Sequence, residues 1–166
     1  MKAFVKDANL LIDLLEGRID GHWFGLGYEV FTSSLVLIEI TDPGQRATVN
    51  ALVTQGALRV VDVPADGWDD VASLADQWGV SVPDASAAKL AMDLEATLLS
   101  GDGRLRAKAR EARLDVKGTL WVFDHLVELE RLSFSEAASA LRRVLVAGSF
   151  LPRDECEARL ALWDAG

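Results

Sequence analysis

The sequence predicts an α/β fold in which a central parallel sheet is covered by helices on both faces. Short apolar runs of strand-forming residues alternate with helical runs five times, which is typical of successive βαβ units. Half of the 166 residues are apolar, which is enough to bury a substantial core. No flexible linker interrupts the chain, so we expect one domain over residues 1–132 and C-terminal helices over residues 133–166 that pack on it.

The five expected strands are short, and a helix follows each of them. In chain order the strand-like runs are KAFVK, YEVFTS, ALRVVDV, ATLLS and LDVKG. The helical runs that follow them are ANLLIDLLEG, SLVLIEI, GWDDVASLADQWG, GRLRAKAREARL and TLWVFDHLVELERL. Two further helices are expected before the third and fourth strands, in PGQRATVNALVTQG and PDASAAKLAMDLEA. Helical connections of this kind join parallel strands.

After residue 118 the strand signal stops and only helical runs follow. SFSEAASALRRVLVAG has Ser133 or Ser135 as the N-cap and ends at Gly148, and PRDECEARLALWD follows it. The sheet is therefore expected to have five strands.

Composition excludes several classes of protein. The single cysteine, Cys156, has no second cysteine to pair with and no nearby ligand for zinc, which suits a reducing compartment. The N-terminus has no long apolar segment of the secretory type, and no run of 18 apolar residues occurs elsewhere. We therefore expect a cytoplasmic protein that makes no contact with a membrane.

The net charge of −9 argues against a nucleic-acid partner, but the basic residues are not evenly spread. Six of the seventeen lie between Arg104 and Lys117, in a stretch that contains only two acids. Two interpretations stay open: a solvated helix face, or an electropositive edge on an acidic protein.

Four isolated carboxylates fall near strand ends or helix starts of the predicted fold. They are Asp7, Glu39, Asp84 and Asp102. Each has an ordinary explanation, such as helix capping for Asp7 or turn formation for Asp102 between two glycines. If the first and fourth strands are neighbours, however, Asp7 and Asp102 meet at the carboxyl edge of the sheet, where α/β proteins bind ligands. Asp13 has no such partners, and we expect it at the surface.

Four converging acids would repel one another, and a divalent cation would relieve the repulsion. Glu39 is the most informative of them, because its run is otherwise apolar and a buried lone carboxylate is costly. An all-oxygen site favours Mg²⁺ or Mn²⁺, and such ions promote attack of water at phosphorus. The sequence therefore predicts phosphodiester hydrolysis. It contains no glycine-rich phosphate loop and no nucleophile elbow.

Four segments together resemble the PIN domain, the metal-dependent ribonuclease fold shared by VapC toxins of toxin–antitoxin pairs. The segments are VKDANLLIDLL, SLVLIEI, VPDASAAKLAMDLEATLLSGDGRLRAKARE and LDVKGTLWVFDHLVELERLSF, which cover most of positions 3–135. The last segment is most similar to an uncharacterised, VapC-like branch of the family. The resemblance implies a three-layer α/β/α domain, Mg²⁺ or Mn²⁺ dependence and endonucleolytic cleavage of RNA. It also implies a homodimer and a cognate antitoxin protein.

The resemblance also assigns roles to individual residues. Asp7, Glu39, Asp84 and Asp102 match the acidic metal site of the family, Asn9 matches a polar residue that supports the first acid, and Ser100 precedes the fourth acid where the family has Thr or Ser. Many relatives carry a further acid or Asn after the fourth acid, whereas this chain has GRLRAK, so a filled second metal site is not expected. We expect Arg104, Arg106 and Lys108 to contact RNA instead.

Two other functions compete with a ribonuclease. The first is a catalytically silent PIN-like scaffold that binds RNA or protein, which gives no reason to retain four mutually repelling acids. The second is a receiver-like phosphorylation domain, suggested by Asp62, Ser100 and Lys117 at strand ends. The receiver interpretation leaves Glu39, Asp84 and Asp102 without a role.

Overall fold

A five-stranded, all-parallel sheet forms the centre of the computed structural model, which describes residues 3–166. The strands are β1 (Ala3–Lys6), β2 (Glu29–Ser33), β3 (Arg59–Val61), β4 (Thr97–Leu99) and β5 (Val116–Lys117). Their order across the sheet is β3-β2-β1-β4-β5. The first half of the chain therefore builds outward from β1 on one side and the second half on the other. This arrangement places a topological switch point between β1 and β4.

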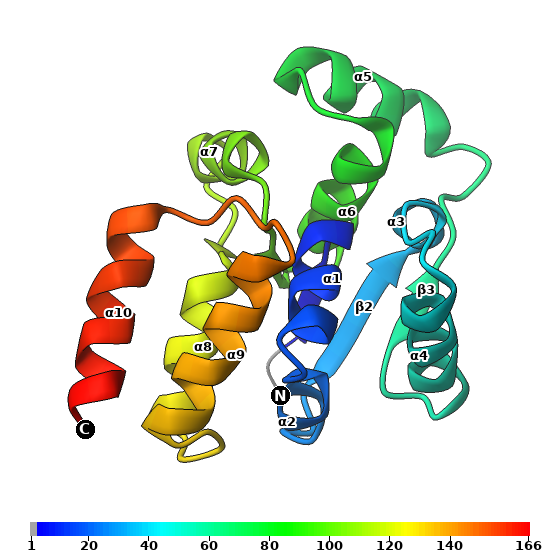
Figure 1. Ribbon diagram of the computed structural model, residues 1–166. Helices are drawn as coiled ribbons and strands as arrows, with labels where there is room; N and C mark the ends of the chain where they lie inside the picture. Colours follow the sequence, from blue (N-terminus) through cyan, green and yellow to red (C-terminus); the bar gives the residue numbers. More distant parts are fainter. Residues whose placement is uncertain (1–2) are drawn as a thin grey trace.

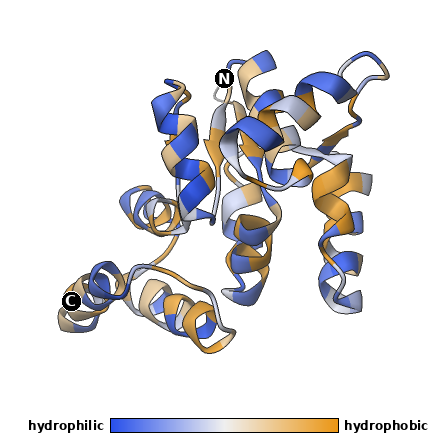
Figure 2. Cartoon of the chain, turned by 90° about the horizontal axis from the view of Figure 1, so that it is seen from above, coloured by the Kyte–Doolittle hydropathy of each residue, from blue (hydrophilic) through white to orange (hydrophobic). Residues whose placement is uncertain are grey.

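Ten helices surround the sheet in the described part of the chain (Figure 1). They are α1 (Ala8–Glu16), α2 (Asp20–Phe24), α3 (Ser34–Ile38), α4 (Pro43–Thr54), α5 (Trp68–Trp78), α6 (Val82–Asp93), α7 (Gly103–Glu111), α8 (Thr119–Glu128), α9 (Phe134–Val146) and α10 (Arg153–Ala165). Hydrophilic and hydrophobic residues alternate around them, as expected for helices that cover a core on one side (Figure 2). The predicted three-layer α/β/α fold is confirmed.

The central strands β1 and β4 are buried on both faces, so adjacent residues enter different cores. Phe4 packs with Leu99 and with side chains of α1, α2, α8 and α9, while Val5 packs with Leu98 and with side chains of α3, α4, α6 and α7. This double burial explains why the strands read as short, nearly continuous apolar runs. Within residues 3–166, no helix combines the length and the apolar character that crossing a membrane requires.

The C-terminal helices share the core that contains Phe4. Leu141 of α9 and Trp163 of α10 are buried there, and the ring of Trp163 lies 6.2 Å from that of Phe123 in α8. Arg143 of α9 also donates a hydrogen bond of 2.7 Å to the carbonyl oxygen of Gly17, at the end of α1. Residues 133–166 are therefore packed on the α/β unit.

The start of α9 decides between the two candidate N-caps. Ser133 accepts a hydrogen bond from the backbone N–H of Glu136, and the Glu136 carboxylate accepts one from the N–H of Ser133. The helix ends before Gly148, which has a φ of +97°, a conformation that glycine adopts without strain. Ser133, and not Ser135, is the cap.

We expect Ser133→Ala to lower the free energy of unfolding by about 1 kcal/mol, because the backbone N–H of Glu136 loses the hydroxyl that accepts its hydrogen bond. Thermal unfolding should show a melting temperature about 2–4 °C lower. Ser135→Ala, on an exposed residue of the same turn, is the matched control and should change little. Equal losses in the two variants would contradict the assignment of the cap.

Candidate active site

The ends of β1 and β4 bring two of the four acids together. Lys6, the last residue of β1, is in register with Leu99, the last residue of β4, and the N–H of Asp7 donates to the carbonyl oxygen of Leu99 at 3.1 Å. Asp102 follows β4 by three residues and caps α7 through the N–H of Leu105 at 2.8 Å. Both acids therefore lie at the carboxyl edge of the sheet.

Asp7 is almost completely buried and fully hydrogen-bonded. One carboxylate oxygen accepts from the N–H of Leu10 at 2.9 Å and from the N–H of Gly101 at 3.3 Å, and the other accepts from the hydroxyl of Ser100 at 2.5 Å. Burial and, to a smaller extent, the charge of Asp84 raise the pKa of Asp7 to about 6, against the effect of these hydrogen bonds. Asp7 is thus the N-cap of α1 and also a carboxylate whose charged form is disfavoured by burial.

Asp84 links the four acids electrostatically. It is half-buried in the first turn of α6, and its pKa is raised by desolvation and by the charge of Asp102, while Ser81 opposes the shift with a hydrogen bond. Glu39, the C-cap of α3, has a pKa raised first by desolvation and then by the charge of Asp84. The negative charge of Asp84 therefore raises the pKa values of Asp7 and Glu39, and the negative charge of Asp102 raises the pKa of Asp84.

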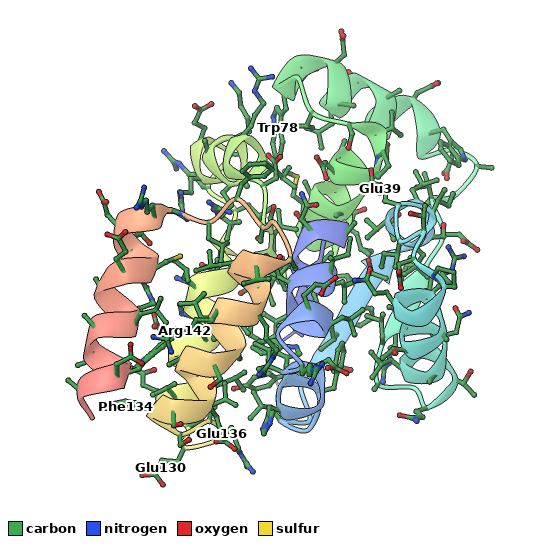
Figure 3. The ribbon with its side chains drawn as sticks, in the orientation of Figure 1. Glu39, Trp78, Glu130, Phe134, Glu136 and Arg142 are labelled. Atoms are coloured by element: carbon green, nitrogen blue, oxygen red, sulfur yellow. The ribbon has the colours of Figure 1, made fainter. Side chains whose placement is uncertain are left out.

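Glu39 is exposed, so the argument that it is a buried lone carboxylate was wrong. Helix α3 is a single short helix that buries only Val36, and both Ile38 and Glu39 reach the surface at its end. Figure 3 shows Glu39 at this end of α3, on the side where α6 passes. Its proximity to Asp84, rather than its burial, connects it to the site.

The four acids suit a hard divalent cation by chemistry and by charge. All four offer carboxylate oxygens, and within residues 3–166 no Lys or Arg forms an ion pair with any of them. In the same part of the chain, however, no group of three or more His, Cys, Asp or Glu side chains is arranged to hold a metal ion. The four carboxylates are therefore of the chemical type that binds Mg²⁺ or Mn²⁺, but they are not close enough together to coordinate one ion as they are placed in the described residues.

Comparison with known proteins identifies the fold family. The sequence model of a PIN domain family matches residues 3–165. The chain belongs to the PIN domain family. PIN domains are generally nucleases and typically use divalent metals, and the matched range includes the C-terminal helices.

A solved structure shows the same fold. The crystal structure of PAE2754 from Pyrobaculum aerophilum superposes with a TM-score of 0.57 at 19% sequence identity, over 76% of this chain and 98% of that one. At this identity the likeness concerns the fold alone. Among curated proteins no match is found.

Ser100 connects two acids of this PIN domain. It is fully buried, its hydroxyl donates to Asp7, and its oxygen accepts from the N–H of Asp102 at 3.0 Å. Asn9, the other expected supporting residue, is exposed and makes no hydrogen bond to Asp7 among the described residues. It lines a cavity of about 390 Å³ together with Asp102 and the exposed Phe150.

The three basic residues expected to contact RNA have different surroundings. Arg104 donates to the carbonyl oxygen of Gly79 at 3.0 Å, and Lys108 pairs with Glu111 at 3.4 Å. Arg106 donates to the carbonyl oxygen of Ser100 at 2.9 Å. Of the three, Arg106 is thus bonded directly to the loop that carries Asp102.

Two buried charged residues near the site were not predicted. Asp13 is only 6% exposed, and its carboxylate accepts from the hydroxyl of Thr119 at 2.7 Å, so the expectation that it lies at the surface was wrong. Its position three residues after the buried Leu10 is the signal that places it on the inner face of α1. Lys6 is completely buried over the ring of Trp23, at 4.1 Å from its centroid, and desolvation holds its pKa well below the usual value.

We expect Thr119→Val to lower the free energy of unfolding by about 1–3 kcal/mol, because the buried carboxylate of Asp13 loses a hydrogen-bond donor. Burial already raises the pKa of Asp13, and the hydrogen bond from Thr119 opposes this effect. Loss of that hydrogen bond therefore makes the charged carboxylate less stable in the folded protein. Urea unfolding measures the change. Thr48→Val, which removes an exposed hydroxyl that bonds only the helix backbone, is the control; if it costs as much as Thr119→Val, the contact with Asp13 is not what stabilises the start of α8.

Proposed function

We propose that this PIN domain is a Mg²⁺- or Mn²⁺-dependent endoribonuclease. The observation that supports the proposal is the electrostatic coupling of Asp84 to Asp7, Glu39 and Asp102, from four separate segments at one edge of the sheet. Placing four acids here without an ion pair to any Lys or Arg of the described residues costs stability, which is expected where a site is kept for an external cation.

Asp7, Glu39, Asp84 and Asp102 would hold the ion. When bound, it supplies positive charge that activates a water and stabilises the negative charge developing at phosphorus. Asp7 is fixed for this task by Ser100, Leu10 and Gly101, so its carboxylate does not need to reorganise. Asp84, Glu39 and Asp102 are more exposed and have room to turn toward a common ligand.

The proposal is tested by incubating purified protein with RNA in Mg²⁺ or Mn²⁺ and, separately, in EDTA. We expect cleavage that EDTA abolishes and that Asp7→Asn or Asp102→Asn reduces by about a hundredfold or more. Glu128→Gln removes an exposed carboxylate at the far end of α8 and should cleave like the wild type. Equal cleavage by the wild type and both Asn variants would reject the site.

One observation favours the scaffold alternative, in which the domain binds RNA or protein without cutting it. No metal-holding group of acids is formed within residues 3–166. Thermal unfolding with and without Mg²⁺ separates the two functions: a nuclease site should raise the melting temperature of the wild type and not that of Asp7→Asn. Failure to cleave, together with no stabilisation by the metal, would establish the scaffold.

We further propose that the protein acts in the cytoplasm as a homodimeric toxin that a cognate antitoxin neutralises. The support is the VapC-like character of the sequence over positions 3–135. Expression of the wild type should slow growth of a bacterial host and expression of Asp7→Asn should not. A small open reading frame upstream, whose product restores growth on co-expression, would support the pairing; growth unaffected by the wild type would favour a solitary processing enzyme.

A further inference from the structure

A second cavity, of about 430 Å³, lies among α7, the end of β5, the start of α8 and the start of α10. We call it the α7–α8 cavity. It shares no lining residue with the cavity that contains Asn9 and Asp102. Its charged lining residues are Arg106, Arg110, Lys117, Arg159, Asp124 and Glu155. They give a local excess of positive charge on a chain whose net charge is −9.

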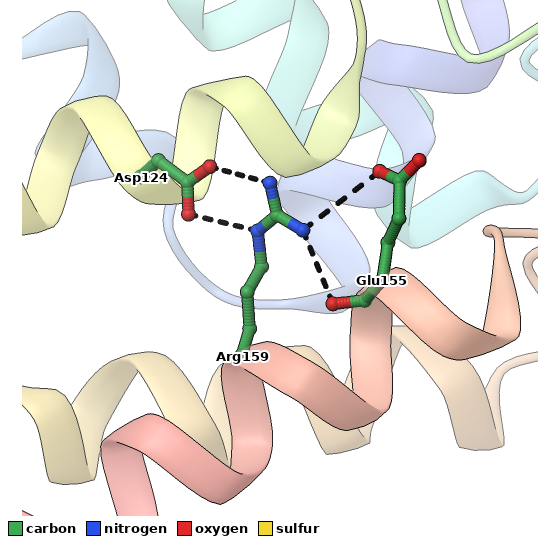
Figure 4. Close-up of polar contacts among 3 residues, drawn as sticks. All are labelled: Asp124, Glu155 and Arg159. Carbon is green, nitrogen blue, oxygen red and sulfur yellow. Dashed lines mark hydrogen bonds and ion pairs between the residues drawn. The ribbon is translucent and has the colours of Figure 1, made fainter.

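The two acids of the α7–α8 cavity are already paired with one of its arginines. The guanidinium of Arg159 donates to both carboxylate oxygens of Asp124, at 2.8 and 2.6 Å, and lies 3.8 Å from the carboxylate of Glu155 (Figure 4). This bidentate contact holds α10 against α8. Arg106, Arg110 and Lys117 therefore provide the positive charge that remains.

Within the described part of the chain, these three residues make few polar contacts with other side chains, and none of the contacts is a close ion pair. Arg106 uses one N–H for the carbonyl oxygen of Ser100, and no acid within residues 3–166 pairs with Arg106 or Arg110. Lys117 has only a loose, exposed contact of 3.7 Å with Asp115, which contributes little in water. Their charges are available to an anion in the cavity.

The start of α8 adds backbone donors to the same cavity. This ten-residue helix begins after Gly118, and it has no side-chain cap because its N-cap residue is a glycine. A helix start without a side-chain cap presents backbone N–H groups and a positive dipole end, both of which favour an anion. The guanidinium of Arg106 lies against Gly118, 3.5 Å from the position of a Cβ there.

Hydrogen bonds connect the α7–α8 cavity to the acidic site. Arg106 binds the backbone carbonyl of Ser100, and the hydroxyl of the same serine binds Asp7. Lys117 is the last residue of β5, which pairs in parallel with β4, so Lys117 lies at the same edge of the sheet as Asp102. Arg106 and Lys117 therefore lie beside the segment that carries Asp102.

We infer that the α7–α8 cavity binds a backbone phosphate of the RNA, held by Arg106, Arg110, Lys117 and the N–H groups at the start of α8. The inference rests on the proposed function for the identity of the ligand. It also changes the expected RNA contacts, because Arg104 and Lys108 do not line the cavity whereas Arg110 and Lys117 do. The cavity contacts phosphate and not bases, so it contributes affinity rather than sequence preference.

The test measures binding of a fluorescein-labelled single-stranded RNA oligonucleotide by anisotropy, in EDTA so that cleavage does not interfere. Arg110→Gln with Lys117→Gln should raise the Kd about 5–20-fold and make the dependence of log K on log salt shallower by about 1–2. Arg131→Gln removes one exposed charge just beyond the C-terminal end of α8 and should leave the Kd within about twofold of the wild type and the salt dependence unchanged. An unchanged Kd in the double variant, or an equal loss in Arg131→Gln, overturns the inference.

The position of the bound phosphate is tested with matched oligonucleotides that carry either a 5′-phosphate or a 5′-hydroxyl. Equal affinity supports an internal phosphate, and loss of binding without the terminal phosphate overturns the assignment to the backbone. The binding assay is independent of catalysis. If the wild type does not cleave RNA but the double variant binds it more weakly, the nuclease proposal is rejected and the phosphate-binding cavity is retained. If the wild type cleaves RNA and the double variant binds it unchanged, the nuclease proposal is retained and the phosphate-binding cavity is rejected.

Discussion

Asp7→Asn should make the protein more stable in EDTA while it removes RNA cleavage. The buried carboxylate has a pKa of about 6 in the folded protein against an ordinary value of 3.8, so its ionisation opposes folding. This difference corresponds to about 3 kcal/mol at neutral pH. Asn retains the oxygen that caps α1 and carries no charge. We therefore expect a gain of about 1–3 kcal/mol, or roughly 2–10 °C in melting temperature.

The gain should depend on pH in a defined direction. Between about pH 4 and 6 the folded protein retains the proton of Asp7 that the unfolded chain has lost, so the wild type loses stability as pH rises through this range. Above about pH 6 the loss is complete and stays constant. The stability difference between Asp7→Asn and the wild type should therefore grow from pH 4 to 6 and then level off in thermal unfolding measured across pH.

Asp102→Asn is the matched control for the predicted gain in stability and loss of cleavage in Asp7→Asn. It also replaces an N-cap by another good N-cap and is also expected to abolish cleavage. Asp102 is half-exposed, however, so water already solvates its charge. A stability gain in Asp102→Asn as large as that in Asp7→Asn would show that the burial of Asp7 is not the cause.

Ser100→Ala should reduce RNA cleavage by about 10–100-fold, the range typical of residues that orient a metal ligand. The variant removes the donor to one oxygen of Asp7 and the acceptor of the Asp102 N–H. Because the hydroxyl of Ser100 lowers the pKa of Asp7, its loss should also move the acidic limb of the cleavage pH profile to higher pH. We expect a parallel loss of about 1–3 kcal/mol in stability, because both groups are buried or partly buried.

Ser100→Thr separates a positioning role from a general loss of packing. It keeps the hydroxyl, so the pH profile should return to that of the wild type even if the extra methyl group costs some stability. If Ser100→Ala lowers stability without shifting the pH profile or the cleavage rate, Ser100 has a structural role only. Cleavage rates across pH and urea unfolding of the same three proteins provide the comparison.

The fold followed from local patterns in the sequence. Doubly buried parallel strands must be apolar, and long crossover connections, usually helices, must join them, so the alternation from KAFVK to LDVKG was sufficient to predict the sheet. Helix caps are also local, which is why the start of α9 was narrowed to Ser133 or Ser135 before the geometry selected Ser133.

The sequence indicated where the candidate acids lie along the chain but not how deeply each is buried. Strand order brings Asp7 and Asp102 to one edge, as their positions after β1 and β4 indicated. Burial was misjudged in both directions, since Glu39 is exposed and Asp13 is inside. Whether a polar residue on a helix is buried depends on what packs against that face, and only α8 places Thr119 opposite Asp13.

By itself the sequence determined the parallel α/β architecture and the positions of Asp7 and Asp102 after two of its strands, because periodicity and the residues at strand ends are local properties of a chain. Only the tertiary structure decided the roles of the basic residues. Arg106, Arg110 and Lys117 are spread over twelve positions and two elements, and they face one cavity because β5 and α8 fold back beside α7. Packing in three dimensions, and not spacing along the chain, sets which charges share a site.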